Sequence, residues 1–565
     1  MRKSLLFVAA ILTWGFSAFA QEDPSLSPYT SWGDQHIANV NVTSYQLSVP
    51  SAAEIEAMKN PEKQGRFEKS GTIIPVNLNL QNSGMMQVLP GGDRLWRIRI
   101  HAPGALALNP YFENFEIPEG ARLHVYNEDK SDLLGAFTSA NNHESGIFAT
   151  WYVKGDVMIL EYFEPLAVAG QGHFDLTGVS FFFRNIVWET ETRASDPCEV
   201  DVNCSEGTGW NGQRDGVVRL LTKVGSSTGF CSGSIINNTQ QDCTPYILTA
   251  FHCGYDAGTN SMSSTADYNA YVFRFNYQKA SCGSGVAGGV NQTGCVIRSW
   301  SNDQGGDTGS DFMLVELNAN IASNILPFFN GWDANNTAPS GGVGIHHPAG
   351  DVKKISTFTA TATSTKWGAS APNGTHWRFP WVATANGWGV TEGGSSGSPI
   401  FRGSNRLIVG TLTGGASCCT SNGCGAGTGP SAQDYYGKMS YHWTSNGSTA
   451  NRQLKPWLDP TNTGVLTLDG AYAPCSAGSE EISIDNLVNV YPNPSNGVVN
   501  IQISELTTET LHYAVYNQFG QLVLNGSVAS GNMNYSIDLS AMAKGIYFVD
   551  FTMGMKKASK KVVLQ

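Results

Sequence analysis

The chain has 565 residues, and its 46 acidic residues exceed its 34 basic residues by 12. A nucleic-acid partner would favour a basic face, so this charge balance argues against one. Charged residues make up only 14% of the chain, while Gly, Ser, Thr and Asn are abundant, which is typical of an all-β extracellular protein. The length predicts more than one domain.

The N-terminus has the pattern of a signal peptide. Arg2 and Lys3 precede an apolar stretch from Leu5 to Ala10, and Ala18-Phe19-Ala20 stands before Gln21. This order of basic, apolar and small residues predicts a signal peptide over residues 1–20 rather than a membrane anchor. No other long apolar run follows, so no transmembrane segment is predicted once the signal peptide is removed.

Residues 21–193 contain stretches in which apolar and polar residues alternate, such as 95–100, 121–126 and 157–162. This alternation, with Gly, Pro and Asn between the stretches, predicts the strands of an antiparallel β-sandwich. The segment holds no cysteine and no candidate catalytic set, so it is either a prodomain or a separate binding module. Its position between the signal peptide and the catalytic motifs favours a β-rich prodomain.

Residues 194–470 have short strand patterns with turn residues throughout, and all 11 cysteines of the chain fall between Cys198 and Cys475. Such cysteines predict the disulfides of an exported protein. Zinc is not predicted, because no pair of CxxC motifs is present and neither His346 nor His347 has cysteine neighbours. We expect no metal and no cofactor.

Three spaced aspartates, Asp303, Asp307 and Asp311, raise the question of a calcium site. They lack the ligand periodicity of a known calcium loop. Solvated turn residues are therefore the favoured interpretation of this spacing.

A candidate base and the residue that would orient it lie in this region. His252 stands in Thr249-Ala250-Phe251-His252-Cys253, and a neutral imidazole is the group that can take the proton of a serine hydroxyl near neutral pH. A carboxylate must hold that imidazole in one tautomer. Asp311 is the candidate, because it stands at the head of an apolar run that predicts a buried strand.

The candidate nucleophile is Ser396, in the run Gly393-Gly394-Ser395-Ser396-Gly397-Ser398-Pro399. Glycines before the nucleophile let the backbone bend, so that the N–H groups of Gly394 and Ser396 point at the developing oxyanion. Both flanking motifs resemble those of chymotrypsin-like proteases. The chain order His252, Asp311, Ser396 is that of the chymotrypsin fold and differs from the orders in subtilisin and the α/β-hydrolases.

Beyond these motifs, residues 198 to about 470 resemble the lysyl endopeptidase family of secreted bacterial serine proteases. The resemblance implies a chymotrypsin-like double β-barrel and three disulfides, Cys198–Cys419, Cys204–Cys282 and Cys231–Cys253. Five cysteines are left over, an odd number that leaves at least one thiol unassigned: Cys243, Cys295, Cys418, Cys424 and Cys475. The residues that carry the resemblance are Cys198 to Cys204, Asn276 to Gln278, Ser310 to Phe312, Gly331 to Asp333, Ile345 to Pro348, Gly389 to Glu392, Asp434 to Gly437 and Trp457 to Pro460.

The resemblance also implies a specificity. Trypsin places a pocket carboxylate six residues before the nucleophile, and here that position is Val390. The family resemblance points instead to Asp434, whose counterpart pairs with the substrate ammonium, against the alternative of a turn Asp on a solvated loop. Trp381 takes the place of the family's pocket-side tryptophan, whereas Thr413, just before Gly414 and Gly415, stands where its stacking histidine would be. We expect cleavage after Lys, with Arg a slower substrate.

After a small-residue linker at 471–485, residues 486–565 resemble the C-terminal sorting domain of the type IX secretion system. The resemblance rests on Val490-Tyr491-Pro492-Asn493-Pro494-Ser495-Asn496-Gly497, Val515-Tyr516-Asn517 and Gly545-Ile546-Tyr547-Phe548-Val549. The segment predicts a small β-sandwich, with an adhesion module as the alternative. A sorting domain implies a partner in the secretion machinery and export by way of the periplasm to the cell surface or the medium.

The sequence thus predicts an all-β precursor with a signal peptide (1–20), a β-rich prodomain (21–193), a trypsin-like serine protease (194–470), a linker (471–485) and a sorting domain (486–565). Its activity would be hydrolysis of protein or peptide substrates through an acyl-enzyme on Ser396. The alternative from another class is an inactive protease-like surface protein that binds or adheres.

Overall fold

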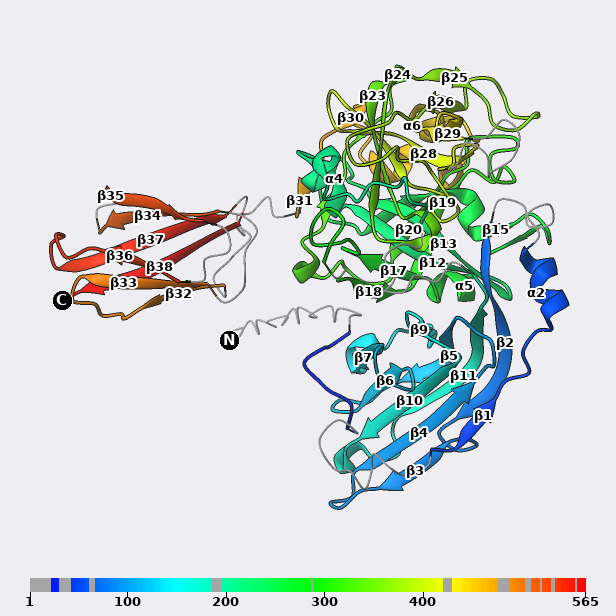
Figure 1. Cartoon of the computed structure of the whole chain (residues 1–565), viewed down its shortest axis with the longest axis horizontal. Helices are drawn as coiled ribbons and strands as arrows, with labels where there is room; N and C mark the ends of the chain where they lie inside the picture. The colour runs from blue at the N-terminus through cyan, green and yellow to red at the C-terminus, as the bar shows by residue number, and fades with distance from the viewer. Residues whose placement is uncertain are drawn as a thin grey trace, which may run out of the picture. The chain divides into compact units, whose positions relative to one another are not determined.

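A computed structural model describes the chain at residues 22–29, 42–59, 67–184, 195–285, 288–419, 429–475, 487–503, 510–518, 521–529, 534–553 and 556–565. It consists of two compact units, one up to Pro474 and the other from Cys475 (Figure 1). Strands dominate both units, so the predicted all-β class is confirmed. The predicted signal peptide, residues 185–194 around the expected prodomain boundary and most of the expected linker lie outside the described residues.

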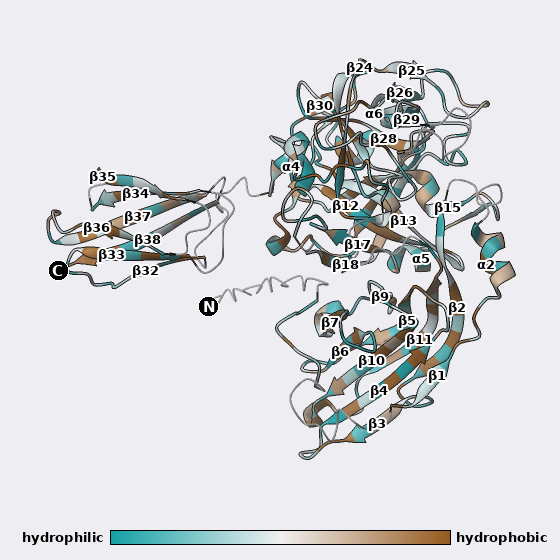
Figure 2. Cartoon of the chain, viewed as in Figure 1, coloured by the Kyte–Doolittle hydropathy of each residue, from teal (hydrophilic) through white to brown (hydrophobic). Residues whose placement is uncertain are grey.

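The N-terminal part of the first unit is a sandwich of β-strands. One layer has the order β1-β4-β10-β6-β7, with β3 beside β4, and the other contains β2, β11, β5 and β8. Apolar side chains from the two layers form a common core, and they appear as brown segments along these strands in Figure 2. The elements are β1 (Ser44–Gln46), α2 (Ala52–Lys59), β2 (Lys69–Asn79), β3 (Met85–Val88), β4 (Arg94–His101), β5 (Ala107–Glu116), β6 (Arg122–Tyr126), β7 (Leu133–Phe137), β8 (Phe148–Ala149), β9 (Val153–Lys154), β10 (Val157–Glu164) and β11 (His173–Phe182).

The next strands form the first β-sheet region of the central part, with an apolar core of its own. Strand β13 pairs with β12 and β14, and β14 pairs with β20. The elements are α4 (Asn211–Asp215), β12 (Val217–Val224), β13 (Ser227–Ile235), β14 (Tyr246–Thr249), β15 (Tyr255–Asp256), β16 (Ser261–Met262), α5 (Thr265–Asn269), β17 (Val272–Phe275), β18 (Val290–Thr293), β19 (Cys295–Trp300) and β20 (Met313–Leu317).

A second β-sheet region follows, in the order β24-β23-β27-β28-β29-β26-β25, with further apolar cores. The helices α6 (Met439–Thr444) and α7 (Lys455–Leu458) come after its strands. Its strands, with the short pairs at its border, are β21 (Phe328–Phe329), β22 (Trp332–Asp333), β23 (Ser340–His346), β24 (Lys354–Thr361), β25 (Thr363–Thr365), β26 (His376–Pro380), β27 (Pro399–Arg402), β28 (Ile408–Gly415), β29 (Gln433–Lys438), β30 (Thr467–Leu468) and β31 (Ala471–Tyr472).

The N-terminal sandwich and the first sheet region are joined by a strand pairing. Strand β2 runs antiparallel to the start of β13, with Thr72 opposite Ser227 and Gly71 opposite Thr228, so that one sheet of 12 strands runs through both. The sandwich core also includes Phe230 and Val272 from the far side of this junction. The two parts therefore share both a sheet and a core.

Three disulfides cross-link the central part, and they are the pairs that the family resemblance implied: Cys198–Cys419, Cys204–Cys282 and Cys231–Cys253, with Cα–Cα distances of 5.4, 4.4 and 6.2 Å. Cys243, Cys418 and Cys475 are disulfide-bonded as well, and Cys424 lies outside the described residues. Cys295 is a buried free thiol. Burial raises the pKa of this thiol, which makes it a packing residue rather than a reactive one.

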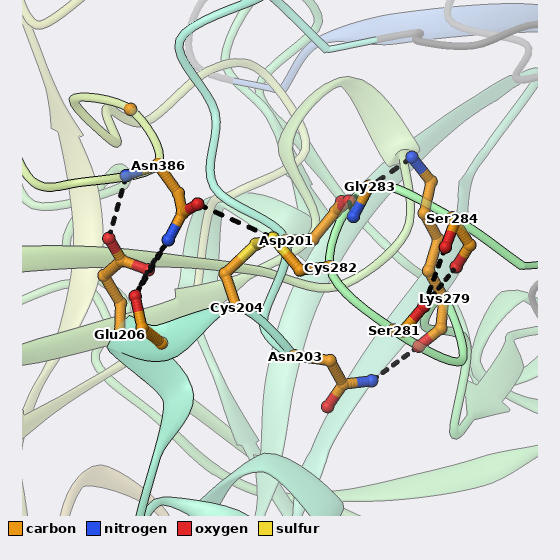
Figure 3. Close-up of a disulfide and its surroundings, with 12 residues drawn as sticks. Asp201, Asn203, Cys204, Glu206, Lys279, Ser281, Cys282, Gly283, Ser284 and Asn386 are labelled. Atoms are coloured by element: carbon orange, nitrogen blue, oxygen red, sulfur yellow. Dashed lines mark hydrogen bonds and ion pairs between the residues drawn. A yellow bond between two sulfur atoms is a disulfide. The ribbon is translucent and has the colours of Figure 1, made fainter.

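The Cys204–Cys282 disulfide lies between two polar contacts that fix the loops on either side (Figure 3). On one side the Glu206 carboxylate accepts hydrogen bonds from the main-chain N–H and side-chain amide of Asn386, at 3.1 and 2.8 Å. On the other side Asp201 pairs with Lys279 at 3.3 Å. The disulfide thus anchors the first residues of the central part to two distant loops.

The second unit is built from two small sheets, β32-β33-β36 and β35-β34-β37-β38, around one apolar core. Its strands are β32 (Val488–Tyr491), β33 (Val498–Ile503), β34 (Leu511–Asn517), β35 (Leu522–Val528), β36 (Asn534–Asp538), β37 (Gly545–Met553) and β38 (Lys556–Leu564). Along β37 Tyr547, Val549 and Phe551 are buried while their neighbours face solvent, the pattern of a sheet with one covered face. No helix in the described part of the chain is long and apolar enough to cross a membrane.

Candidate active site

The pairing of two strands brings His252 to Asp311. In the antiparallel pair β14–β20, Thr249 lies opposite Met313, so the residues just beyond these ends meet. The main-chain N–H of His252 donates to Asp311 Oδ1 at 3.0 Å, and His252 Nδ1 lies 2.7 Å from Oδ2 of the same carboxylate. Both side chains are buried. This double contact fixes the ring and leaves Nε2 as the nitrogen that can take a proton.

A second carboxylate, that of Asp303, accepts a hydrogen bond from the main chain of Asp311. The main-chain N–H of Asp311 donates to Asp303 Oδ2 at 2.7 Å, and Asp303 is only 3% exposed. The expectation that Asp303 is a solvated turn residue is therefore wrong. Burial raises the pKa of Asp303 to about 6, with a further contribution from the charge of Asp311.

The glycine-rich loop that carries Ser396 packs against the strands that lead to His252. The main-chain N–H of Ser232, in β13, donates to the carbonyl of Ser396 at 2.8 Å, and the Ser232 hydroxyl donates to the carbonyl of Gly394 at 2.9 Å. A Cβ at Gly397 would collide with the Thr249 hydroxyl. Glycine at 397 is thus what lets the loop approach the end of β14, three residues before His252.

The two expected oxyanion donors are available. Among the described residues, no acceptor receives a hydrogen bond from the main-chain N–H of Gly394 or of Ser396. Gly394 has a φ of +94°, a conformation that favours glycine. The loop therefore presents two N–H groups beside the half-buried Ser396, which is the arrangement that stabilises a negatively charged oxygen.

Two histidines to which the sequence analysis assigned no role at the site support this loop. His346 Nδ1 lies 2.8 Å from the Ser395 hydroxyl, and its Nε2 lies 2.8 Å from the Ser356 hydroxyl. The main-chain N–H of His347 donates to the Ser232 hydroxyl at 2.9 Å. Burial lowers the pKa of His346 to about 3, so it acts as a neutral hydrogen-bonding group.

A pair of carboxyl groups lies at the start of the same loop. Glu199 is buried beside the carboxyl group of Glu392, and His346 Nε2 lies 3.9 Å from its Oε2. Burial, followed by the charge of Glu392, raises its pKa well above the usual value, and burial raises the pKa of Glu392 to about 7. The two groups therefore share a proton at neutral pH.

Metal binding at this acidic pair has weak support. Within the described ranges, the one group of three candidate metal ligands contains Asp196, Glu392 and Cys419. The sulfur of Cys419 is bonded to Cys198, so it is not free to bind a metal ion.

Asp434 lies in β29 and is fully buried. Oδ2 accepts hydrogen bonds from Trp381 Nε1 at 2.6 Å, from the Thr391 hydroxyl at 2.7 Å and from the Ser417 hydroxyl at 2.6 Å. The alternative of a solvated turn Asp is therefore wrong. Burial raises its pKa above 3.8 against these hydrogen bonds. No Lys, Arg or His of the described chain forms an ion pair with it.

The other residues expected near the specificity pocket surround this carboxylate. Gly414 and Gly415 end β28, and Gly415 lies opposite Asp434 in the β28–β29 pair. Thr413 is buried, and its hydroxyl lies 3.0 Å from His376 Nε2. The imidazole of His376, in β26, therefore lies beside Thr413, the position at which the family would have its stacking histidine. Sequence reasoning missed His376 because it lies 37 residues away in the chain.

Comparisons with known proteins match two parts of the chain. Residues 192–437 match the family model described as lysyl endopeptidase, C-terminal domain, and residues 489–565 match the secretion system C-terminal sorting domain. The lysyl endopeptidase of Pseudomonas aeruginosa is 26% identical over 69% of this chain and 85% of its own length. A secreted RxLR effector protein 73 of Plasmopara viticola is 24% identical over 53% of this chain and 72% of its own.

Among solved structures, the protease Anisep from Arthrobacter nicotinovorans covers 40% of this chain and 90% of its own, with 16% identity and a TM-score of 0.27. The family matches and the curated relative define the class, a secreted or cell-surface serine protease of the trypsin-like type. More narrowly, the chain has a segment that matches the lysyl endopeptidase C-terminal domain, followed by one that matches the secretion sorting domain, and both parts of the sequence resemblance are confirmed.

The shared proton of Glu199 and Glu392 predicts a pH dependence of stability. Both folded-state pKa values are raised, so the folded chain keeps protons that the unfolded chain releases near pH 4.5. The contribution of the pair to the free energy of unfolding therefore falls as the pH rises from about 4.5 through about 7. Glu199→Gln, whose amide donates permanently to Glu392, should raise the melting temperature at pH 8 more than at pH 5.

This measurement uses thermal unfolding of the precursor in a Ser396→Ala background, which prevents self-digestion. Exposed Glu119→Gln is the control and should leave the pH dependence unchanged. A Glu199→Gln variant that is destabilised equally at both pH values would show that the two carboxyl groups share no proton.

Proposed function

We propose that the chain is the precursor of a secreted endopeptidase that cleaves after Lys through an acyl-enzyme. The observation that carries the proposal is the buried 2.7 Å contact of His252 with Asp311 next to the Ser396 loop. His252 Nε2 takes the Ser396 proton as Oγ attacks the carbonyl carbon, and then gives it to the leaving amine as the peptide bond breaks. Water hydrolyses the resulting ester by the same proton route, with the N–H groups of Gly394 and Ser396 stabilising the oxyanion.

Ser396→Ala should abolish hydrolysis and covalent labelling by a fluorophosphonate probe, because the hydroxyl is the nucleophile. Ser395→Ala is the matched control. It loses the contact with His346 but should still be labelled. Labelling of Ser396→Ala together with loss of labelling in Ser395→Ala would contradict this assignment.

The specificity proposal rests on the surroundings of Asp434. Its carboxylate is buried among neutral donors without a cation, and a buried charge without an opposite charge is costly. The ammonium of a substrate Lys would supply that charge. Val390, at the position of trypsin's carboxylate, is buried in an apolar cluster and offers none. Cleavage after Arg at a lower rate is the alternative within the same site.

Asp434→Asn should lower kcat/KM for Lys substrates by about 10²–10³-fold, because the substrate ammonium would lose its partner in a desolvated site. The amide keeps the size of the side chain, so labelling of Ser396 by the fluorophosphonate probe should persist and reports a folded site. The measurement compares peptide substrates with Lys, Arg or Ala before the scissile bond. Unaltered cleavage after Lys would place the specificity determinant elsewhere.

We further propose that residues 21–193 are an inhibitory prodomain rather than a separate binding module. The proposal is supported by contacts at the entrance to β2. Phe67 is 1% exposed, Lys69 pairs with Asp256 at 2.8 Å, and Glu68 Oε2 occupies the place that a Cβ at residue 393 would take. His252 Nε2 is itself buried and without a hydrogen bond. The chain that enters β2 therefore lies against the loop before Ser396 and the segment that follows His252.

Buried aromatic contacts add to this interface. Arg219, fully buried in β12, lies under the rings of Trp151 and Tyr152 from the sandwich and Phe230 from β13, at 4.4 to 5.8 Å from the ring centroids. Such cation–π contacts are strongest where water is excluded. Cutting the connection at residues 185–194 would therefore leave the prodomain bound by the shared sheet and core, and release would require its further digestion.

Replacing Phe67 and Glu68 together by Ala should speed fluorophosphonate labelling of the uncleaved precursor at least about tenfold, because a buried anchor and a blocking carboxylate are removed. Labelling is followed on gels against the slowly labelled wild-type precursor. Leu166→Ala, on an exposed part of the sandwich, is the control and should change nothing. A wild-type precursor that is labelled as fast as the processed enzyme would contradict the proposal.

The competing candidate is an inactive surface protein that uses this fold for adhesion. The intact contact between His252 and Asp311 and the two available N–H groups count against it, because adhesion requires neither. Processed enzyme that takes up no fluorophosphonate would favour it.

A further inference from the structure

A second buried carboxylate lies directly behind the candidate triad. Asp303 Oδ2 accepts the main-chain N–H of Asp311 at 2.7 Å, and Oδ1 accepts that of Gly306 at 2.9 Å. The residue is 3% exposed. No Lys, Arg or His of the described residues forms an ion pair with it, so its negative charge adds to that of Asp311 instead of being neutralised.

The backbone of Asp311 shows why this contact matters. Asp311 has a φ of +59°, a left-handed conformation that is uncommon outside glycine and persists only where the surroundings fix it. The hydrogen bond to Asp303 fixes the N–H of this residue. The next N–H, of Phe312, donates to the Ser301 hydroxyl at 3.2 Å. The segment 301–303 therefore sets the direction in which the Asp311 side chain leaves the start of β20.

The strand register explains how Asp303 reaches this place. Strand β19 ends at Trp300, which lies opposite Met313 in the β19–β20 pair. The chain that leaves β19 must therefore pass beside the residues that enter β20. A carboxylate three residues after the end of β19 meets the N–H two residues before β20.

We propose that Asp303 is a positioning residue of the catalytic site. It orients Asp311, and its charge, transmitted through Asp311, stabilises the His252 imidazolium that forms during acyl transfer. The inference rests on the proposed function and deepens it, because it assigns to a residue outside the triad a share in the basicity of His252.

The other groups around this carboxylate do not cancel its effect. Tyr441 faces Asp303, whose charge adds to burial in raising the pKa of the tyrosine, so the phenol stays neutral. His442 is near Asp311, but burial lowers its pKa to about 3. It hydrogen-bonds the hydroxyls of Ser310 and Thr411, at 2.8 and 3.0 Å. In the described surroundings His252 is therefore the cation that responds to Asp303.

The sign of the pH effect follows from these charges. The pKa of Asp303 is raised to about 6, so the group is ionised at neutral pH and becomes protonated as the pH falls through 6. Its charge stabilises the imidazolium form of His252 that arises during proton transfer. Removing the charge should shift the acid limb in the profile of kcat/KM against pH to lower pH.

The test measures kcat, KM and fluorophosphonate labelling of the processed enzyme between pH 4 and 9 for Asp303→Asn and Asp303→Ala. Asp303→Asn keeps an oxygen acceptor for the Asp311 N–H and removes the charge. It should lower kcat about tenfold, leave KM within about twofold and shift the acid limb to lower pH. Asp303→Ala removes the acceptor as well and should lower kcat about 100-fold. Asp307→Asn, in the same loop, is the matched control and should match the wild type.

The outcomes separate the inference from the proposed function. A wild-type enzyme that takes up no fluorophosphonate would refute the proposed function itself. An active wild type with an Asp303→Asn variant of normal kcat would overturn the positioning role. So would a variant in which a smaller fraction of molecules can be labelled but the activity per labelable molecule keeps the wild-type acid limb, or one that fails to fold, since both results indicate a purely structural residue.

Discussion

The candidate site depends on the buried contact between His252 and Asp311, and this contact depends on the strand register of the first sheet region. Two side chains 59 residues apart meet because β14 and β20 are adjacent antiparallel strands in one register. A slip by one residue would turn every side chain of β20 to the other face of the sheet. The Cys231–Cys253 disulfide holds the turn after β14 to β13. In turn, β13 holds the Ser396 loop through hydrogen bonds from the main-chain N–H and the hydroxyl of Ser232. The geometry that the proposed acyl transfer requires is thus a consequence of strand order.

The structure buries three carboxyl groups that form no ion pair with a Lys or Arg of the described residues, and it compensates each in a different way. Asp434 receives neutral donors, Glu199 shares a proton with its neighbour, and Asp303 receives two main-chain N–H groups. Neutral donors stabilise a charge without cancelling it. The site therefore keeps a negative potential in a region of low dielectric, where a substrate ammonium or a transient imidazolium gains the most. The same potential would repel substrates with an acidic side chain before the scissile bond.

The sequence alone predicted the all-β class, the sorting domain and the protease family, because each is carried by a short contiguous motif or by local alternation. It also led to His252 and Asp311, which lie 2.7 Å apart, since the base has recognisable neighbours in the chain. It failed for Asp303, which was interpreted as solvated, and it missed His346 and His376 as supporting residues. The roles of the two histidines depend on contacts between residues 37 to 49 positions apart in the chain, and that of Asp303 depends on the register of β19 and β20. No periodicity in the chain reports such contacts, and single polar residues in turns look alike whether they are exposed or buried.

The sheet shared by the N-terminal sandwich and the first sheet region affects the stability of that region. Strand β13 uses Ser227 and Thr228 to pair with β2, and Phe230 contributes to the sandwich core. Without the sandwich these main-chain groups and this ring would lose their partners, and exposed apolar surface and unpaired strand edges are costly. The first sheet region therefore gains stability from the sandwich. The same sandwich segment lies against Gly393 in the Ser396 loop, so the inhibitory prodomain that we propose would link folding of the protease to its inhibition.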